Sequence, residues 1–559
     1  MLTFRRAVLA PLVALSIALF AVPAASAAWG DLDPTFGGTG SINTLPGDGY
    51  GTLYDSAQQA DGKILLAGAG GPDFFNANGM LQRLLVDGTP DPGFGSGGTL
   101  LLTSPAALEK HEIRAISLQS DGKIVGIAAD GDDGVLFRVT DAGALDTTFA
   151  SPNGYLSFAN EVLHDVTVGP AGEIFVGSKT ASNDVVLRRF TQSGAQVGAF
   201  VSNSAPALAS TTFYGTPYDG LSLTPSESGL FMATTSEVMS TAVLFAAKFD
   251  LAGNLVTDWG TNGKTTVEFA SGVSAEDVVR QSSGAIVIGG TTETMGDNAW
   301  HLARLDANGN LDPSFAGGGK IDINPTPGGD GLSALANSPD GGLVAVGSID
   351  DLATDNSIPA IRAMSADGAP HADFGPDGMR YVPLPGAGGF ESTFVQPDGR
   401  IVAAGSVQLD SNNERVPAVA RLQANPVIPV SAPVLSAKVT SPKGKSIAAK
   451  KLKKFAGTAA TTSGSVTKVE IALQRTDKKL LKKSKRCLWL SSNRAKFKKV
   501  KASKSEKCSK PKWLKASGTV KWSYKLKKKL PKGSYVLQVR VTGGGATTVF
   551  ATARKFRVK

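Results

Sequence analysis

The chain of 559 residues has little of what most metalloenzymes, hydrolases and membrane proteins use. It contains two Cys and four His, and aromatic residues make up only 7% of it. No H-E-x-x-H zinc motif, G-x-S-x-G nucleophile elbow or G-x-x-x-x-G-K-[ST] phosphate loop occurs. After residue 27 no stretch approaches the ~18 uninterrupted apolar residues of a membrane-spanning helix. We therefore expect a soluble chain without a ready-made catalytic, cofactor-binding or metal-binding motif.

The first residues have the three-part pattern of a secretory signal peptide. Arg5 and Arg6 precede an apolar run, which ends at the small-x-small sequence Ala25-Ser26-Ala27. We predict that residues 1–27 are removed and that the protein is secreted, extracellular and associated with the cell wall. A retained membrane anchor is the alternative, and the Arg pair leaves export by the Sec or the twin-arginine route open.

What the chain has in abundance is Gly, 65 in all, much of it in an internal repeat. The plainest copy, QPDGRIVAAGS at residues 396–406, joins a tight Asp-Gly turn to a buried strand. Its Gly recurs in steps of 60, 50, 57, 55, 57 and 58 residues, at Gly62, Gly122, Gly172, Gly229, Gly284, Gly341 and Gly399. Self-similarity at such a period predicts units that bury their apolar faces only against their neighbours.

Two further motifs complete each unit. One carries an aromatic residue between glycines, interpreted as a core plug, at Phe36, Phe94, Phe149, Phe200, Trp259, Phe315 and Phe374. The other is an apolar strand with a basic residue, at Arg83, Arg138, Arg189, Lys248, Arg304, Arg362 and Arg421. Four short strands per unit predict an all-β, seven-bladed β-propeller. Because the array begins with a fourth strand and ends with a third, the N-terminal strand should close the last blade.

The combination of L-D-x-x-F-G, Q-x-D-G-K-I and R-L-x-x-x-G resembles the Delta-60 repeat family of bacterial secreted proteins, with a blade order similar to NHL-type propellers. The resemblance covers residues 29–423 and implies the propeller fold. It implies no catalytic residues and no cofactor. The third and fourth units depart from the pattern, since Ala171-Gly172 and Ser228-Gly229 replace Asp-Gly.

The residues most able to carry chemistry favour structural roles. His111, His164, His301 and His371 are scattered, although a triad assembled from distant blades stays open. The acidic run from Asp130 to Gly134 lacks the Glu of a calcium loop and favours an exposed turn. Because they recur, the turn acids Asp61, Asp121, Asp340 and Asp398 should be structural. Recurrence likewise suggests that the seven basic residues hydrogen-bond between blades, with an anion-binding ring as the alternative.

The composition changes after Gln423. Residues 424–433 form a Pro-rich linker, and residues 431–559 hold 36 Lys and Arg against three acids, which leaves 21 basic and 45 acidic residues before them. Period-two alternation, as in VTKVEIALQR at residues 466–475, predicts that residues 434–559 form a basic β-sandwich resembling bacterial immunoglobulin-like domains. Its Cys487 and Cys508 should form a disulfide in a secreted protein, with free thiols as the alternative.

These features lead to two functional hypotheses. The first is a secreted, non-enzymatic binding or scaffold protein, whose propeller loops bind an unknown protein or glycan ligand. Its Lys-rich sandwich would attach it to anionic cell-wall polymers or other polyanions, although the Lys surface could equally contact the acidic propeller of its own chain. The second is a propeller hydrolase or lyase, which requires unique acids or His converging on the axial face.

Overall fold

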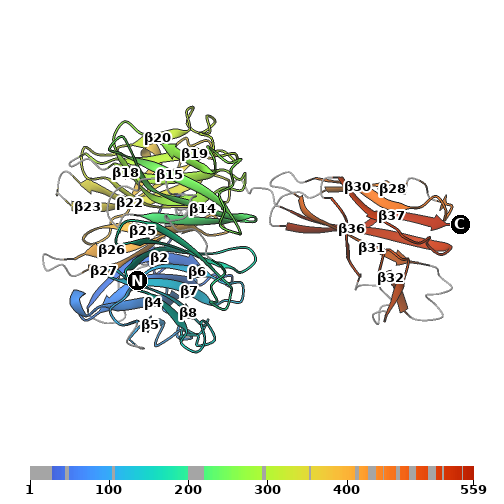
Figure 1. Cartoon of the computed structure of the whole chain (residues 1–559), viewed down its shortest axis with the longest axis horizontal. Coiled ribbons are helices and arrows are strands. Elements are labelled where there is room, and N and C mark those ends of the chain that lie inside the picture. The colour runs from blue at the N-terminus through green and yellow to red at the C-terminus, as the bar shows by residue number, and fades with distance from the viewer. Residues whose placement is uncertain are drawn as a thin grey trace, which may run out of the picture.

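The computed structural model describes residues 28–43, 49–103, 108–198, 220–292, 297–351, 354, 356–409, 415–425, 436–442, 444, 446–460, 466–476, 486–501, 511–518, 521–543 and 546–559. Within these residues the protein is all-β, with short 3₁₀ turns such as η1 (Phe74–Asn76) and η3 (Pro376–Gly378) and no α-helix (Figure 1). None of its helical segments has the length and hydrophobicity to cross a bilayer. The predicted signal peptide and most of the predicted linker lie outside the described residues.

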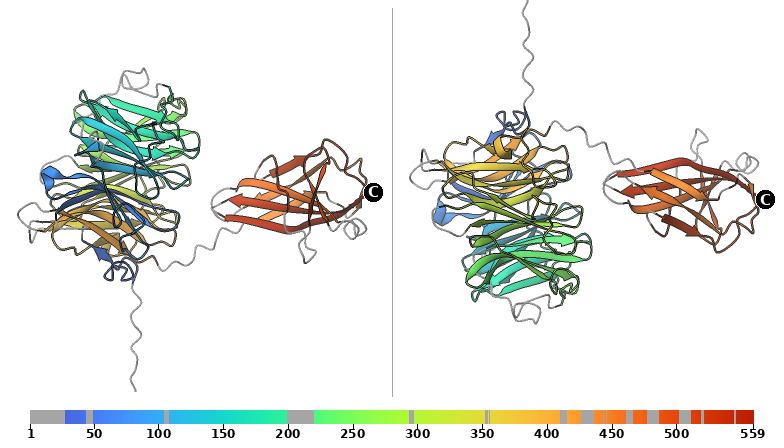
Figure 2. Two further views of the ribbon diagram at one scale, coloured as in Figure 1. Left: turned by 90° about the horizontal axis from the view of Figure 1, so that it is seen from below. Right: turned by 90° about the horizontal axis from the view of Figure 1, so that it is seen from above.

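The first part of the chain consists of antiparallel sheets formed by consecutive strands (Figure 2). Three of them comprise β2 (Tyr50–Gln58), β3 (Ile64–Gly71), β4 (Asn78–Leu84) and β5 (Thr99–Leu101); β6 (Glu112–Leu118), β7 (Ile124–Asp130), β8 (Asp133–Val139) and β9 (Tyr155–Phe158); and β10 (Glu161–Val168), β11 (Ile174–Thr180) and β12 (Val185–Phe190). The next three comprise β13 (Leu221–Ser226), β14 (Gly229–Val238), β15 (Thr241–Asp250) and β16 (Lys264–Val267); β17 (Val273–Arg280), β18 (Ile286–Thr292), β19 (Trp300–Leu305) and β20 (Lys320–Ile323); and β21 (Gly331–Asn337), β22 (Leu343–Asp351), β23 (Asn356–Met364) and β24 (Met379–Tyr381).

The last sheet of this part joins both ends of the array. It combines β25 (Ala387–Val395), β26 (Ile401–Gln408) and β27 (Arg415–Leu422) with the N-terminal β1 (Ser41–Ile42). The register pairs Ile42 with Val419, as expected from the order of the motifs. The backbone N–H of Asp33 donates to the Arg421 carbonyl at 2.8 Å and extends this seam.

The repeated turn motif explains why the strands form where they do. In the last unit, Gly399 has a φ of 89° and its N–H donates to the Gln396 carbonyl, which closes the turn before β26. A side chain at such a φ is strained, so Gly is favoured here. The residues that follow the turn are apolar and buried, because β26 lies between two other strands in a sheet covered on both faces. The motif aromatics, apart from Phe200, which is not described, are buried to within 1% exposure.

The sheets form a closed ring. The first strand of each sheet contacts the first strand of the next, in the order β2, β6, β10, β13, β17, β21 and β25, and β25 contacts β2. We call these the inner strands. Each is the edge of its own sheet, so its unpaired backbone groups face the middle of the ring.

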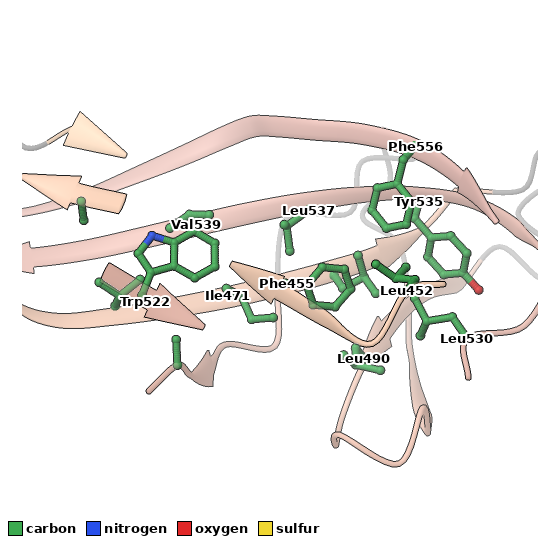
Figure 3. Close-up of a cluster of buried hydrophobic side chains, with 14 of the residues drawn as sticks. Leu452, Phe455, Ile471, Leu490, Trp522, Leu530, Tyr535, Leu537, Val539 and Phe556 are labelled. Carbon is green, nitrogen blue, oxygen red and sulfur yellow. The ribbon is translucent and has the colours of Figure 1, made fainter. Parts of the chain in front are cut away.

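The second part of the chain has two sheets around one core. The smaller sheet contains β28 (Ser436–Ser441), β30 (Lys454–Ala460) and β35 (Lys521–Lys525). The larger contains β29 (Ser446–Ile447), β37 (Ala546–Val558), β36 (Gly533–Gly543), β31 (Val466–Arg475), β32 (Arg486–Leu490) and β33 (Phe497–Lys501), with β34 (Leu514–Lys515) paired to β31. Phe455 and Trp522 from the smaller sheet pack with Ile471 and Leu537 from the larger (Figure 3). Cys508 and the side chain of Cys487 are not described, so the disulfide stays a prediction.

Candidate functional site

The recurring Arg side chains connect neighbouring sheets. Arg138 donates from Nε to Asp146 at 2.9 Å within its own sheet, and its Nη1 donates to the Gln192 carbonyl in the next sheet. Its guanidinium lies 4.9 Å from the centre of the Phe149 ring. Arg83, Arg189, Arg304 and Arg421 each reach a carbonyl in the following sheet, at Asp141, Leu251, Ala366 and Val86. The predicted hydrogen bonding between units is confirmed for these five.

The other two basic residues differ. Lys248 has a single ammonium, which lies 5.2 Å from the centre of the Phe231 ring. Burial lowers the pKa of Arg362, against the opposing charges of Asp377 and Tyr381, and its Nε has no hydrogen-bond partner among the described residues. The seven recurring basic residues therefore do not all make the same contacts.

The four His do not come together. His111, His164, His301 and His371 belong to different sheets or their loops, and no three metal-ligand side chains cluster anywhere in the described part of the chain. The acidic run forms the exposed tip of the β7–β8 hairpin, where the backbone of Asp130 is paired with that of Asp133. Neither region provides a metal site among these residues.

One group of side chains has the connectivity of a hydrolase triad. His301 Nε2 lies 2.6 Å from Thr292 Oγ1, and His301 Nδ1 lies 2.8 Å from Asp322 Oδ1. Thr292 is buried, however, whereas the carboxylate of Asp322 is 71% exposed. Nucleophilic catalysis needs the reverse arrangement, with an accessible hydroxyl and an enclosed carboxylate. The group therefore supports the sheet rather than a reaction.

Six of the inner strands carry a β-bulge at the same register. The bulged residue is polar and differs from sheet to sheet: Tyr54, Arg114, His164, Glu276, Ser333 and Glu391. A bulge interrupts alternation, so a side chain is redirected from the interface between sheets. Each of the six is half-buried or exposed, although buried apolar residues precede them. The ring is thus lined by side chains that the repeat does not dictate.

The residue after the bulge is Asp in three of these sheets. Asp55 accepts the N–H of Ile116 at 2.7 Å, Asp165 that of Leu223 at 2.6 Å, and Asp277 that of Leu335 at 2.8 Å. Each carboxylate thereby satisfies an unpaired backbone donor of the next inner strand. These Asp residues join alternate pairs of sheets.

The position of these carboxylates changes their protonation. Desolvation raises the pKa of Asp55 to about 6 and that of Asp165 to about 8, and the negative charge of Asp277 adds to both shifts. Desolvation also raises the pKa of Asp277. The surrounding inner strands remove most of the hydration of these carboxylates, which disfavours their charged form.

The richest grouping of unrepeated side chains lies where β2 meets β6. Tyr54 donates to Glu112 Oε2 at 3.0 Å, and Arg114 makes an ion pair with the same oxygen at 2.7 Å. The Arg114 guanidinium lies 4.5 Å from the centre of the Tyr54 ring and remains 44% exposed. Burial raises the pKa of Tyr54 despite Arg114, and Glu112 raises it further. This phenol therefore acts as a neutral donor.

An exposed aromatic pair adjoins this grouping. Phe74 contacts Tyr50 edge to face with ring centres 5.4 Å apart, and Phe75 contacts Phe74 at the same distance. Phe74 is 59% exposed and Phe75 83% exposed, at the η1 turn between β3 and β4. We call Tyr50, Tyr54, Phe74, Phe75, Glu112 and Arg114 the β2–β6 cluster. It combines exposed aromatic rings packed on Tyr50 with a guanidinium and a carboxylate that contact Tyr54.

Pockets also lie outside this cluster. One of about 150 Å³ is bounded by Trp29, Asp340, Val344, Asp398 and Ile401, at the turns that precede β22 and β26. It has space for a few heavy atoms.

Sequence patterns missed the β2–β6 cluster for a physical reason. Phe74 and Phe75 lie between two repeat motifs, where no periodicity marks a residue, and the position of a bulge depends on how two strands pair rather than on the residues of one strand. Asp55, Asp165 and Asp277 did carry a signal, because Asp stands at an equivalent position in alternate repeats.

The ring of three- and four-stranded antiparallel sheets defines the class of the first part, which is a β-propeller. A family model described as "Domain of unknown function (DUF5122) beta-propeller" matches residues 59–94, 281–315 and 396–425. A search of curated proteins finds no relative of this chain.

Solved structures similar to this chain include several propellers. The BP39L lectin from Burkholderia pseudomallei is 11% identical, with 68% of this chain and 96% of that chain covered at a TM-score of 0.43. The β-propeller domain of the Trilobed protease from Pyrococcus furiosus is 8% identical, covering 68% and 98% at a TM-score of 0.36. Prolyl oligopeptidase B from Galerina marginata is 11% identical, covering 73% and 55% at a TM-score of 0.37.

Proposed function

We propose that the protein is a secreted, non-enzymatic binding protein of the cell surface, built on a seven-bladed β-propeller of Delta-60 type. Its propeller binds a polar ligand of the glycan class through the β2–β6 cluster. The observation that carries this proposal is the exposure of Phe74 and Phe75, which extend from Tyr50 on the strand whose Tyr54 contacts Glu112 and Arg114. Exposed aromatic rings with rigid neighbours are typical of binding surfaces rather than of a solvated loop.

The chemistry of the cluster suits a sugar. Aromatic faces pack against the C–H groups of a pyranose ring, while the carboxylate accepts hydrogen bonds from hydroxyls and the guanidinium donates to them. Because Glu112 and Tyr54 hold Arg114 in place, little side-chain entropy would be lost on binding. A glycan with an acidic group would gain a further contact with Arg114.

A glycan array probed with residues 28–559 tests this proposal. The variant F74A/F75A should bind the glycan that the parent binds most tightly roughly 30-fold more weakly than the parent does. This is the effect expected for hot-spot residues. M239A is the matched control, since Met239 is 97% exposed in the β14–β15 connection and lies in another sheet. Equal binding by all three proteins would refute the role of the cluster.

A hydrolase or lyase is the second candidate, and Glu391 favours it. Glu391 faces water within the ring, yet desolvation raises its pKa against the hydrogen bond from Ser333 and the charges of Arg415 and Arg114. Such a carboxyl can serve as a general acid. If glycans found on the array were cleaved and E391Q abolished the cleavage, the enzymatic alternative would replace the binding role.

The second part of the chain serves, in this proposal, as an immunoglobulin-like sandwich that attaches the protein to anionic envelope polymers. Its topology of two sheets around one core supports the assignment, as does the hydrogen bond from Tyr535 Oη to the Pro531 carbonyl at 2.6 Å, which resembles the tyrosine corner of Greek-key sandwiches. The Lys excess supports attachment. We also propose that Cys487 and Cys508 form a disulfide.

A further inference from the structure

We infer that one face of the smaller sheet in the second part is the surface that binds a polyanion, and that its ligand is a linear phosphodiester polymer without stacked bases. This inference rests on the proposed attachment function and assigns it to named residues. The face consists of the outward-pointing positions of β28, β30 and β35 together with the exposed bulge residue Thr440. We call it the basic sheet face: Lys438, Thr440, Lys454, Ala456, Thr458, Lys521, Ser523 and Lys525.

The core of the domain fixes the orientation of this face. Phe455 and Trp522 point inward and are buried, so their neighbours along each strand must point outward. Lys438, Lys454, Lys521 and Lys525 are all exposed. A slip of one residue would bury these ammonium groups, which makes the register, and with it the Lys arrangement, strongly specified.

The cross-strand pairing concentrates like charge. Lys454 lies directly opposite Lys525, and Thr458 lies between Lys438 on one side and Lys521 on the other. Like charges in directly opposed positions repel, and a solvated face ordinarily mixes both signs. None of these four Lys makes an ion pair with another described residue. A ligand with closely spaced negative charges would relieve this repulsion.

The larger sheet provides an internal comparison. There Glu470 accepts from Arg540 at 2.8 Å and pairs with Lys468 at 3.2 Å, so its basic residues are partly neutralised. Among the described residues Glu470 is the acid of this part, and it lies on β31 rather than on the smaller sheet. The smaller sheet thus carries directly opposed Lys with no acid among its described residues, whereas exposed Lys elsewhere, such as Lys498 and Lys555, lie outside this arrangement.

The chemistry of the face favours a phosphodiester polymer. Lys presents compact, mobile ammonium groups, which suit the tetrahedral oxygens of successive phosphates, and Thr440, Thr458 and Ser523 add hydroxyl donors. No outward position carries an aromatic side chain, so bases would find no stacking platform. Adjacent strands are about 4.8 Å apart and alternate residues about 6.7 Å, which places neighbouring charges within reach of one extended chain.

The test measures binding of residues 28–559 to poly(glycerol phosphate) across a range of salt concentrations. We expect the variant K438Q/K454Q/K521Q/K525Q to bind at least about tenfold more weakly at low salt and to lower the slope of log Kobs against log salt by about 3. The control K496Q/K498Q/K532Q/K555Q removes the same charge from exposed positions outside the face and should retain most of the affinity.

The outcomes separate the two levels of the proposal. If the parent protein fails to bind poly(glycerol phosphate) at low salt, the attachment function itself is wrong. If the parent binds and the two variants weaken equally, attachment depends on net charge and the assignment to this face is wrong. Tighter binding of the parent to single-stranded DNA or polygalacturonate would show that the ligand is not a phosphodiester polymer without stacked bases. Binding only to its own isolated propeller would show that the face has no external partner. Circular dichroism of both variants guards against misfolding.

Discussion

At the scale of single residues, recurring Arg side chains connect neighbouring sheets of the ring. Arg138 is buried, and it connects Asp146 and Phe149 in its own sheet with the Gln192 carbonyl of the next. Guanidinium suits this role because it donates in several directions at once, which the ammonium of Lys248 does not. The pKa of Asp146 is well below its usual range, since hydrogen bonds from Thr148 and Lys123 and the charge of Arg138 outweigh its desolvation.

Removal of one of these Arg side chains should therefore destabilise the folded protein. We expect R138A to lower the free energy of unfolding by about 3 kcal/mol, because the buried Asp146 carboxylate and the Gln192 carbonyl would both lose a charged hydrogen-bond donor. Urea denaturation followed by fluorescence measures the change. R280A is the control, since the half-buried Arg280 makes no ion pair among the described residues, and its effect should stay below about 0.5 kcal/mol. A similar small loss in R138A would show that the packing of the sheets alone holds the ring.

The inner Asp residues predict a dependence on pH. Because the folded-state pKa of Asp165 is raised to about 8, the folded protein binds this proton more tightly than the unfolded chain does. The stabilisation from this group should accordingly be complete below about pH 4 and be lost progressively as the pH rises towards 8. D165N should flatten the curve of melting temperature against pH over this interval. D130N, at the exposed hairpin tip between β7 and β8, should leave the curve unchanged, and an unchanged curve in D165N would contradict the assignment.

At the scale of the strands, the basic sheet face retains charge at the expense of stability. The directly opposed Lys454 and Lys525 repel each other, and neither is buried. We expect K525E to raise the free energy of unfolding by a few tenths of a kcal/mol, up to about 1 kcal/mol, by replacing repulsion with attraction. Thermal unfolding at low salt measures this gain, which should shrink at 1 M salt. A gain of the same size from K532E, outside the face, would indicate a general effect of net charge.

The strands also show what a single sequence can reveal. The Asp-Gly turns, the plug aromatics and the Arg positions were predictable, because each recurs with the repeat and any one copy supports the others. The bulges at Tyr54, Arg114 and Glu391 were not, since a bulge depends on how two strands meet rather than on the residues of one. For the same reason the β2–β6 cluster could not be predicted, because its members are distant in sequence and do not recur with the repeat.

At the scale of the whole molecule, one short strand completes the ring. β1 and the preceding turn cover β27 on the side that β26 leaves free, and Phe36 fills the core beneath Arg421. A chain that begins at residue 44 should therefore expose an edge strand and self-associate. Light scattering measures the mass, and the peptide of residues 28–43 should restore the monomer. A monomeric chain without the peptide would show that β1 is dispensable.

The position of β27 has a mechanical consequence. The polypeptide leaves the ring directly after this strand, which is hydrogen-bonded to β26 along one edge and to β1 along the other. If the basic end of the protein is held by the envelope while flow drags on the ring, tension enters along the axis of β27. The two rows of hydrogen bonds are then loaded in shear and share the force, so they do not break one at a time. The seam that closes the ring is therefore also the part best able to withstand pulling.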